Sequence, residues 1–184
     1  MNPYSIPLRN LQRGRSTYSF DCGQEFFAGI EDSLIDDANI HAEVVAQRGE
    51  QLITLDIAIS GTVRAVCDIC LGEFDYEVED CGGHLTLRLG EELREIGDDV
   101  YEVDERADEL DLSQWIYEFV CVSLPIRFEH PEDENGNSTC DPDMLARLED
   151  LDPANREEDD VPTESDEIDP RWAKLAYLKD NDKN

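Results

Sequence analysis

Cys67 and Cys70 stand at C-x-x-C spacing, the pattern in this sequence that points most directly to chemistry. They fall between two runs in which apolar and polar residues alternate, so the spacing predicts a knuckle on a β-hairpin. Such a turn directs two sulfurs toward one point, which is half of a tetrahedral metal site. A redox thiol is favoured at a helix N-terminus, where the dipole lowers its pKa, whereas strands are expected on both sides here. Metal binding is therefore favoured over redox chemistry, with unliganded thiols as the remaining interpretation.

The other half of the site has to come from the remaining cysteines and histidines, which are Cys22, Cys81, Cys121, Cys140, His41, His84 and His130. His130 and Cys140 are favoured because they follow the main predicted helix in a segment free to fold back over the hairpin. Cys121 lies inside that helix, where a small thiol is commonly a core residue, and Cys81 is a weaker candidate. Four protein ligands would leave no open coordination position, so such a site would be structural rather than catalytic.

The hairpin belongs to a longer β-rich region. Period-two alternation predicts strands at residues 41–46, 52–59, 74–79 and 84–89, with a short further strand at 100–103. A turn is expected at residues 48–50 and a kink or bulge at Gly61. Together these patterns predict an antiparallel meander of four or five strands or an open barrel.

Helical periodicity appears at two places. Phe26, Phe27 and Ile30 suit a short helix within residues 23–30. A longer amphipathic helix is expected from residue 111, with Asp111 as N-cap and Gln114 in the capping-box position, ending before Pro125. Its apolar face should pack on the sheet: Leu112, Trp115, Ile116, Phe119, Val120 and Leu124. The predicted fold class is therefore α+β.

The C-terminal part is expected to be a long, acidic and largely disordered tail. We predict a β-rich domain at residues 1–130, an acidic flexible segment at 131–169 with a short helix at 143–151, and a terminal amphipathic helix in 170–184. This terminal helix serves either to dock a partner or to pack back on its own domain.

The chain carries 46 acidic against 15 basic residues, a net charge of −31. Such a surface repels phosphate, so RNA contact should be indirect and basic proteins are the expected partners. Arg9, Arg13 and Arg15 form the one basic stretch, and pairing with the protein's own acids is the favoured use for them. With no membrane-length apolar run and no signal-type N-terminus, we expect a cytoplasmic protein with free or metal-bound thiols. Phosphate-binding and hydrolase motifs are absent, so no enzyme is predicted.

Three features of the sequence together resemble the YceD family of large ribosomal RNA subunit accumulation proteins. They are the stretch C-D-I-C-L-G-E-F at 67–74, Leu124-Pro125-Ile126 followed by His130 and Cys140, and D-P-R-W-A-K-L at 169–175. The resemblance implies the ligand set Cys67, Cys70, His130 and Cys140 for a structural zinc ion. It also implies a role in bacterial or plastid ribosome biogenesis.

We therefore predict a non-enzymatic ribosome-biogenesis factor that supports processing or accumulation of large-subunit ribosomal RNA. Its partner would be a basic ribosomal or ribosome-assembly protein. The alternatives are an RNA-processing enzyme and a zinc- or redox-responsive interaction module.

Overall fold

The computed structural model describes residues 2–152, and the chain divides into two compact units, Met1–Cys140 and Asp141–Asn184. Within the second unit, helix α3 (Pro142–Leu151) confirms the short helix expected at 143–151, and the Asp141 carboxylate caps it by accepting the N–H groups of Asp143 and Met144. Residues 153–169 of the predicted acidic segment and the terminal helix of 170–184 lie outside the described residues. The predicted domain boundaries and the flexibility of 131–169 stay predictions.

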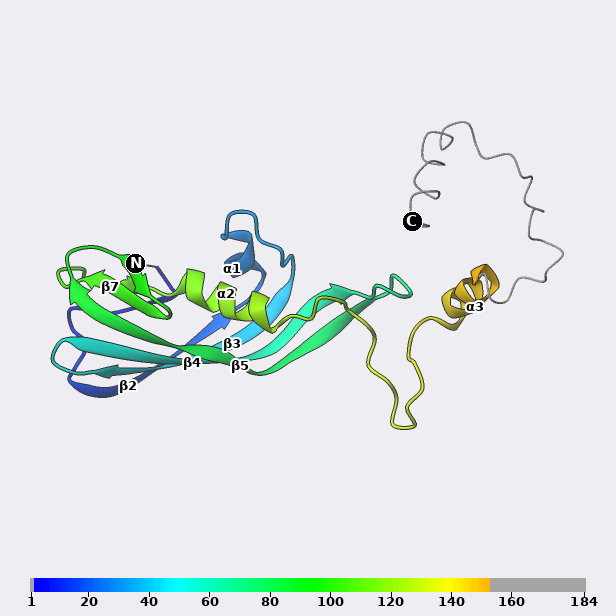
Figure 1. Ribbon diagram of the computed structural model, residues 1–184, viewed down its shortest axis with the longest axis horizontal. Coiled ribbons are helices and arrows are strands. Elements are labelled where there is room, and N and C mark those ends of the chain that lie inside the picture. The colour runs from blue at the N-terminus through cyan, green and yellow to red at the C-terminus, as the bar shows by residue number, and fades with distance from the viewer. Residues whose placement is uncertain (1, 153–184) are drawn as a thin grey trace, which may run out of the picture. The chain divides into compact units, whose positions relative to one another are not determined.

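The first unit is built on a six-stranded sheet of order β2-β3-β4-β5-β7-β6. Its strands are β2 (Gly14–Cys22), β3 (Ala38–Arg48), β4 (Leu52–Val66), β5 (Glu73–Gly90), β6 (Arg94–Gly97) and β7 (Val100–Asp104). Strands β2 to β5 form the expected antiparallel meander (Figure 1). β6 and β7 extend it beyond the predicted four or five strands. β7 runs back between β5 and β6, so it pairs parallel with β5 and antiparallel with β6.

The kink expected at Gly61 is confirmed. The register between β4 and β5 shifts between Ile59 and Gly61, and Gly61 has a φ of 142°. A Cβ atom at this position would lie 2.1 Å from the carbonyl oxygen of Asn39 on β3, so only glycine fits. Beyond the bulge, β4 and β5 continue as a hairpin, which we call the β4–β5 arm (residues 62–66 and 73–78).

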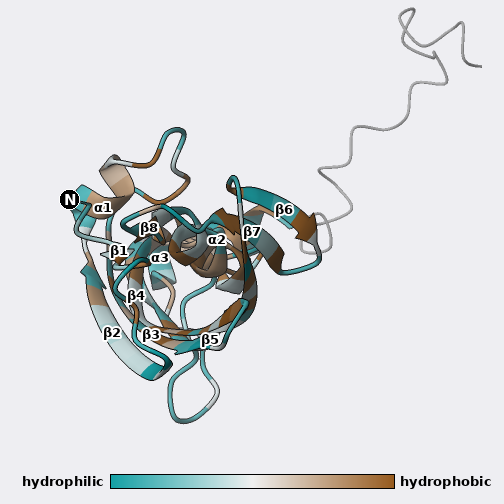
Figure 2. Ribbon diagram, turned by 90° about the vertical axis from the view of Figure 1, so that its left-hand side faces the viewer, coloured by the Kyte–Doolittle hydropathy of each residue, from teal (hydrophilic) through white to brown (hydrophobic). Residues whose placement is uncertain are grey.

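Helix α2 (Ser113–Ser123) packs against β4 and β5, and the sheet curves around it (Figure 2). Trp115, Ile116 and Val120 are buried on its inner face, as the apolar pattern predicted, and the helix ends before Pro125. The shorter α1 (Gln24–Ala28) confirms the helix expected in 23–30 and buries Phe26 and Phe27. No helix among the described residues is both long and apolar enough to cross a membrane.

The predicted capping box at Asp111 is wrong. Strand β8 (Leu110–Asp111) pairs with β1 (Ser5–Ile6), and this pairing holds Asp111 opposite Ser5. Leu112 therefore occupies the N-cap position, without a side-chain cap. The Asp111 carboxylate instead accepts the N–H and hydroxyl of Ser113, and Gln114 donates to Glu118 rather than back to the cap.

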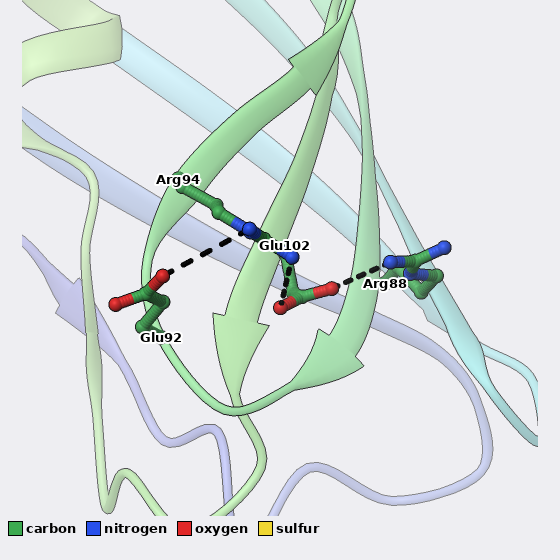
Figure 3. Close-up of polar contacts among 4 residues, drawn as sticks. All are labelled: Arg88, Glu92, Arg94 and Glu102. Atoms are coloured by element: carbon green, nitrogen blue, oxygen red, sulfur yellow. Dashed lines mark hydrogen bonds and ion pairs between the residues drawn. The ribbon is translucent and has the colours of Figure 1, made fainter.

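The far edge of the sheet is fixed by a charged cluster around Glu102 (Figure 3). Glu102 on β7 lies directly opposite Arg88 on β5 and Arg94 on β6, and its carboxylate accepts from both guanidinium groups at 2.5 and 3.2 Å. The hydrogen bond from Arg88 and the charge of Arg94 lower the pKa of Glu102, although its burial opposes this. The cluster ties the parallel β7 and the edge strand β6 to the main sheet.

Candidate metal centre

The knuckle predicted from the C-x-x-C spacing is present at the tip of the β4–β5 arm. β4 ends at Val66 and β5 begins at Glu73. Between them the Cys67 N–H donates to the Gly72 carbonyl at 2.9 Å, and the Leu71 N–H donates to the Cys67 carbonyl at 2.9 Å. The turn closes because Leu71 adopts a left-handed backbone with φ of 60°. Both cysteine side chains are buried in this turn.

The chain returns to the knuckle after α2, and two hydrogen bonds fix it there. The Asp68 N–H donates to the Phe128 carbonyl at 2.8 Å, and the Phe128 N–H donates to the Asp68 carboxylate at 2.7 Å. The Phe128 ring packs edge-on against Tyr76 of the arm, with centroids 5.5 Å apart. The His130 ring lies 4.6 Å from that of Phe74. These contacts place His130 over the knuckle.

Residues 131–140 close into a tight turn that brings Cys140 back beside His130. The Asp133 side chain accepts the N–H groups of Asn135 and Asn137, and these bonds lower the pKa of Asp133. At the base of the turn the Thr139 hydroxyl donates to the Pro131 carbonyl at 2.6 Å. The turn thus places Cys140 next to His130, ten positions earlier in the chain, and the Cys140 side chain is buried.

The four side chains Cys67, Cys70, His130 and Cys140 form one cluster, in which all donor atoms lie within 4.8 Å of one another. The Cys67 and Cys140 sulfurs are 3.7 Å apart, and His130 Nδ1 lies 3.4 Å from the Cys70 sulfur and 3.7 Å from that of Cys140. A tetrahedral zinc ion with ordinary bond lengths requires S···S edges of about 3.8 Å and S···N edges of about 3.6 Å. The cluster therefore has the donor types, number and spacing to hold a metal ion.

The site also favours the ionised ligand that a metal needs. Burial opposes ionisation of the Cys67 thiol, but hydrogen bonds from the backbone of Cys70 and Ile69, together with His130, outweigh it and lower the pKa of Cys67 to about 6. At Cys140 the interaction with Ser138 favours the thiolate, yet burial and the neighbouring sulfurs of Cys67 and Cys70 raise its pKa. The surroundings thus favour the thiolate form at Cys67 and disfavour it at Cys140.

The other candidate ligands lie elsewhere in the fold. Cys121 is half-buried on α2 against the core, and the Cys81 sulfur contacts the Ile59 carbonyl at 3.6 Å. Cys22 is a core residue, and burial followed by the charge of Asp21 raises its pKa to about 12. The two remaining histidines each pair with an aspartate across neighbouring strands, His41 with Asp21 and His84 with Asp56.

Sequence reasoning missed two residues that shape the centre. Asp68 occupies a variable position of C-x-x-C, and nothing in the spacing marks it as the residue that anchors the returning chain. Gly72 lies against the ligands, because a Cβ there would stand 3.4 Å from both the Cys70 sulfur and His130 Cε1. The glycine after the knuckle was the signal available for this close approach of the backbone.

Fold and site together define an α+β protein whose curved sheet carries a Cys₃His cluster able to hold a metal ion. The sequence model of one protein family, described as large ribosomal RNA subunit accumulation protein YceD, matches residues 55–179, a span that includes all four cluster residues. The chain belongs to the YceD family, as its motifs predicted. The family name links it to the accumulation of large-subunit ribosomal RNA. Searches of the curated proteins and of the solved structures each gave no match.

Proposed function

We propose that this protein is a non-enzymatic ribosome-biogenesis factor that acts in the cytoplasm and supports processing or accumulation of large-subunit ribosomal RNA through protein partners. Family membership supports the link to large-subunit RNA. The observation that carries the non-catalytic, structural part of the proposal is the close packing of four donor atoms, three thiols and one imidazole. Four protein ligands complete a tetrahedral shell and leave no position for a reacting water.

Zinc is the metal we propose for this centre. Thiolate and imidazole donors in a tetrahedral array suit zinc better than the oxygen-seeking magnesium or calcium ions. The ion would be held by Cys67, Cys70, His130 and Cys140 and would fasten the segment after α2 to the tip of the arm. This segment is anchored otherwise by the Asp68–Phe128 hydrogen bonds and two aromatic contacts, so the metal would supply much of its rigidity.

The charge distribution supports a protein partner rather than RNA. The chain has a net charge of −31, which repels a phosphate backbone. In the N-terminal basic stretch, Arg9 pairs with Asp108 at 2.8 Å and Arg13 with Glu50 at 3.7 Å. These pairs neutralise two of the three arginines available for RNA. A basic ribosomal or assembly protein is attracted to the same surface.

A deletion strain tests the role in RNA accumulation. We expect the ratio of large- to small-subunit ribosomal RNA to fall, and a plasmid copy of the gene to restore it. A copy carrying Cys70→Ser should restore it poorly, because the knuckle loses a ligand, whereas Cys81→Ser should restore it fully. An unchanged RNA ratio in the deletion strain would contradict the proposal, as would RNA cleavage by the purified, nuclease-free protein that depends on one of its carboxylates.

A further inference from the structure

Leu71, directly after the second cysteine of the knuckle, is held in a conformation that is unfavourable for leucine in two respects. Its φ of 60° lies in the left-handed region, which is disfavoured for any residue with a Cβ. Its side chain is 68% exposed to solvent and takes no part in the hydrophobic core. Glycine at this position would relieve the backbone strain and remove the exposed apolar surface. Contact of the Leu71 side chain with another molecule would explain why leucine is present despite the backbone strain and the exposed apolar surface.

Two further apolar side chains are exposed close to the knuckle. Val66 is the last residue of β4, immediately before Cys67. Ile126 is fully exposed and lies two residues before Phe128, whose backbone is paired with Asp68 of the knuckle. We call Val66, Leu71 and Ile126 the knuckle surface. None of these three side chains is part of the hydrophobic core.

Exposed acids accompany this surface on the knuckle, the arm and residues 124–130: Asp68, Glu73, Asp75, Glu77 and Glu129. The same elements carry two arginines, and both already pair with these acids. Arg64 contacts Glu73 and Asp75 at 3.1 and 3.0 Å, and Arg127 contacts Glu129 at 3.0 Å. Five carboxylates against two guanidinium groups leave these elements with a net negative charge.

We propose that the knuckle surface docks a basic polypeptide segment in which lysine or arginine side chains flank apolar ones. The apolar residues of the partner would cover Leu71 and its neighbours, and its cations would meet the acids of the arm. RNA phosphates and a second copy of this acidic chain would both be repelled there. The inference rests on the proposed function, since it names the surface by which a basic ribosomal or assembly protein would be recognised.

Binding of the zinc-loaded full-length protein to an array of peptides tiling the large-subunit ribosomal proteins of the same cell tests this assignment. We expect the bound peptides to combine lysine or arginine with apolar residues, and Leu71→Gly to weaken binding by about tenfold or more, as loss of an interface anchor does. Leu71→Gly should keep its zinc and be at least as thermally stable as the wild type, because the change relieves strain. Leu93→Gly is the matched control, since Leu93 is a leucine of similar exposure, 61%, in the β5–β6 link, and it should bind normally.

Ile126→Ser provides a second variant with no backbone strain to relieve and should also weaken binding. Wild-type affinity in both variants would overturn the proposal, as would equal binding of polylysine or displacement of the peptides by RNA oligonucleotides at low salt. If the wild type binds no peptide while the gene still restores ribosomal RNA in the deletion strain, the docking surface is wrong and the proposed function stands. If the gene has no effect on ribosomal RNA, the proposed function itself fails.

Discussion

Replacing Cys140 by serine tests the metal centre most directly. Serine keeps the backbone bond from residue 140 to the Ser138 hydroxyl and has nearly the shape of cysteine, so the main change is loss of one sulfur ligand. Structural zinc sites bind with an apparent free energy of about 10–16 kcal/mol, or about 2.5–4 kcal/mol for each of four ligands. That loss corresponds to a roughly 100- to 1,000-fold weaker zinc affinity. At saturating zinc the Cys140→Ser variant would therefore have a free energy of unfolding lower than that of the wild type by the same amount.

Cys121→Ser is the matched control, since Cys121 was another cysteine after the knuckle that could have completed the site. It is half-buried on α2 and packs against the core instead. Elemental analysis of protein purified without chelator should give about one zinc per chain for the wild type and Cys121→Ser. Competition with a chromophoric chelator then measures the affinity of each variant, and chemical unfolding with and without zinc measures the stability that the metal contributes.

Full zinc affinity in Cys140→Ser would refute the geometry of the centre. The same holds if Cys121→Ser loses zinc and Cys140→Ser retains it, because the donor atoms that the structure brings together would then not be the ones that bind. A wild type without zinc, whose stability does not respond to added zinc, would refute the metal assignment altogether.

Two further predictions concern the frame that carries the centre. Gly61→Ala should lower the free energy of unfolding in urea by about 3 kcal/mol or more, because its Cβ would stand 2.1 Å from the Asn39 carbonyl at a φ of 142°. Gly23→Ala has no atom near its Cβ, and as the N-cap of α1 it should cost no more than about 1 kcal/mol. Glu102→Gln should lower the thermal stability at neutral pH by removing the carboxylate partner of Arg88. Because the pKa of Glu102 is lowered from 4.5, its contribution is present above that pH and is lost as the pH falls through the folded-state value, so the difference between variant and wild type should shrink in acid. A difference that grows in acid would contradict this.

The sequence by itself determined the features that depend on neighbours in the chain. Alternation with a period of two placed β3 and β4, and the apolar stripe around Trp115 placed α2 and its inner face. C-x-x-C spacing between strands predicted the knuckle, and a lone glycine in a strand predicted the bulge at Gly61. In each case a few consecutive residues fix the backbone geometry, so the pattern carries the information.

Only the tertiary structure decided what the knuckle meets. Cys67 and Cys140 are 73 positions apart, and their sulfurs come within 3.7 Å because Asp68 pairs with Phe128 and the turn after His130 closes on itself. Spacing along the chain contains no term for such contacts, so the sequence could favour Cys140 over Cys121 but could not show that the Cys140 sulfur meets that of Cys67. The parallel pairing of β7 and the misplaced cap at Asp111 have the same origin. Which segments come together depends on packing and hydrogen bonding between residues distant in sequence, and these contacts override local preference.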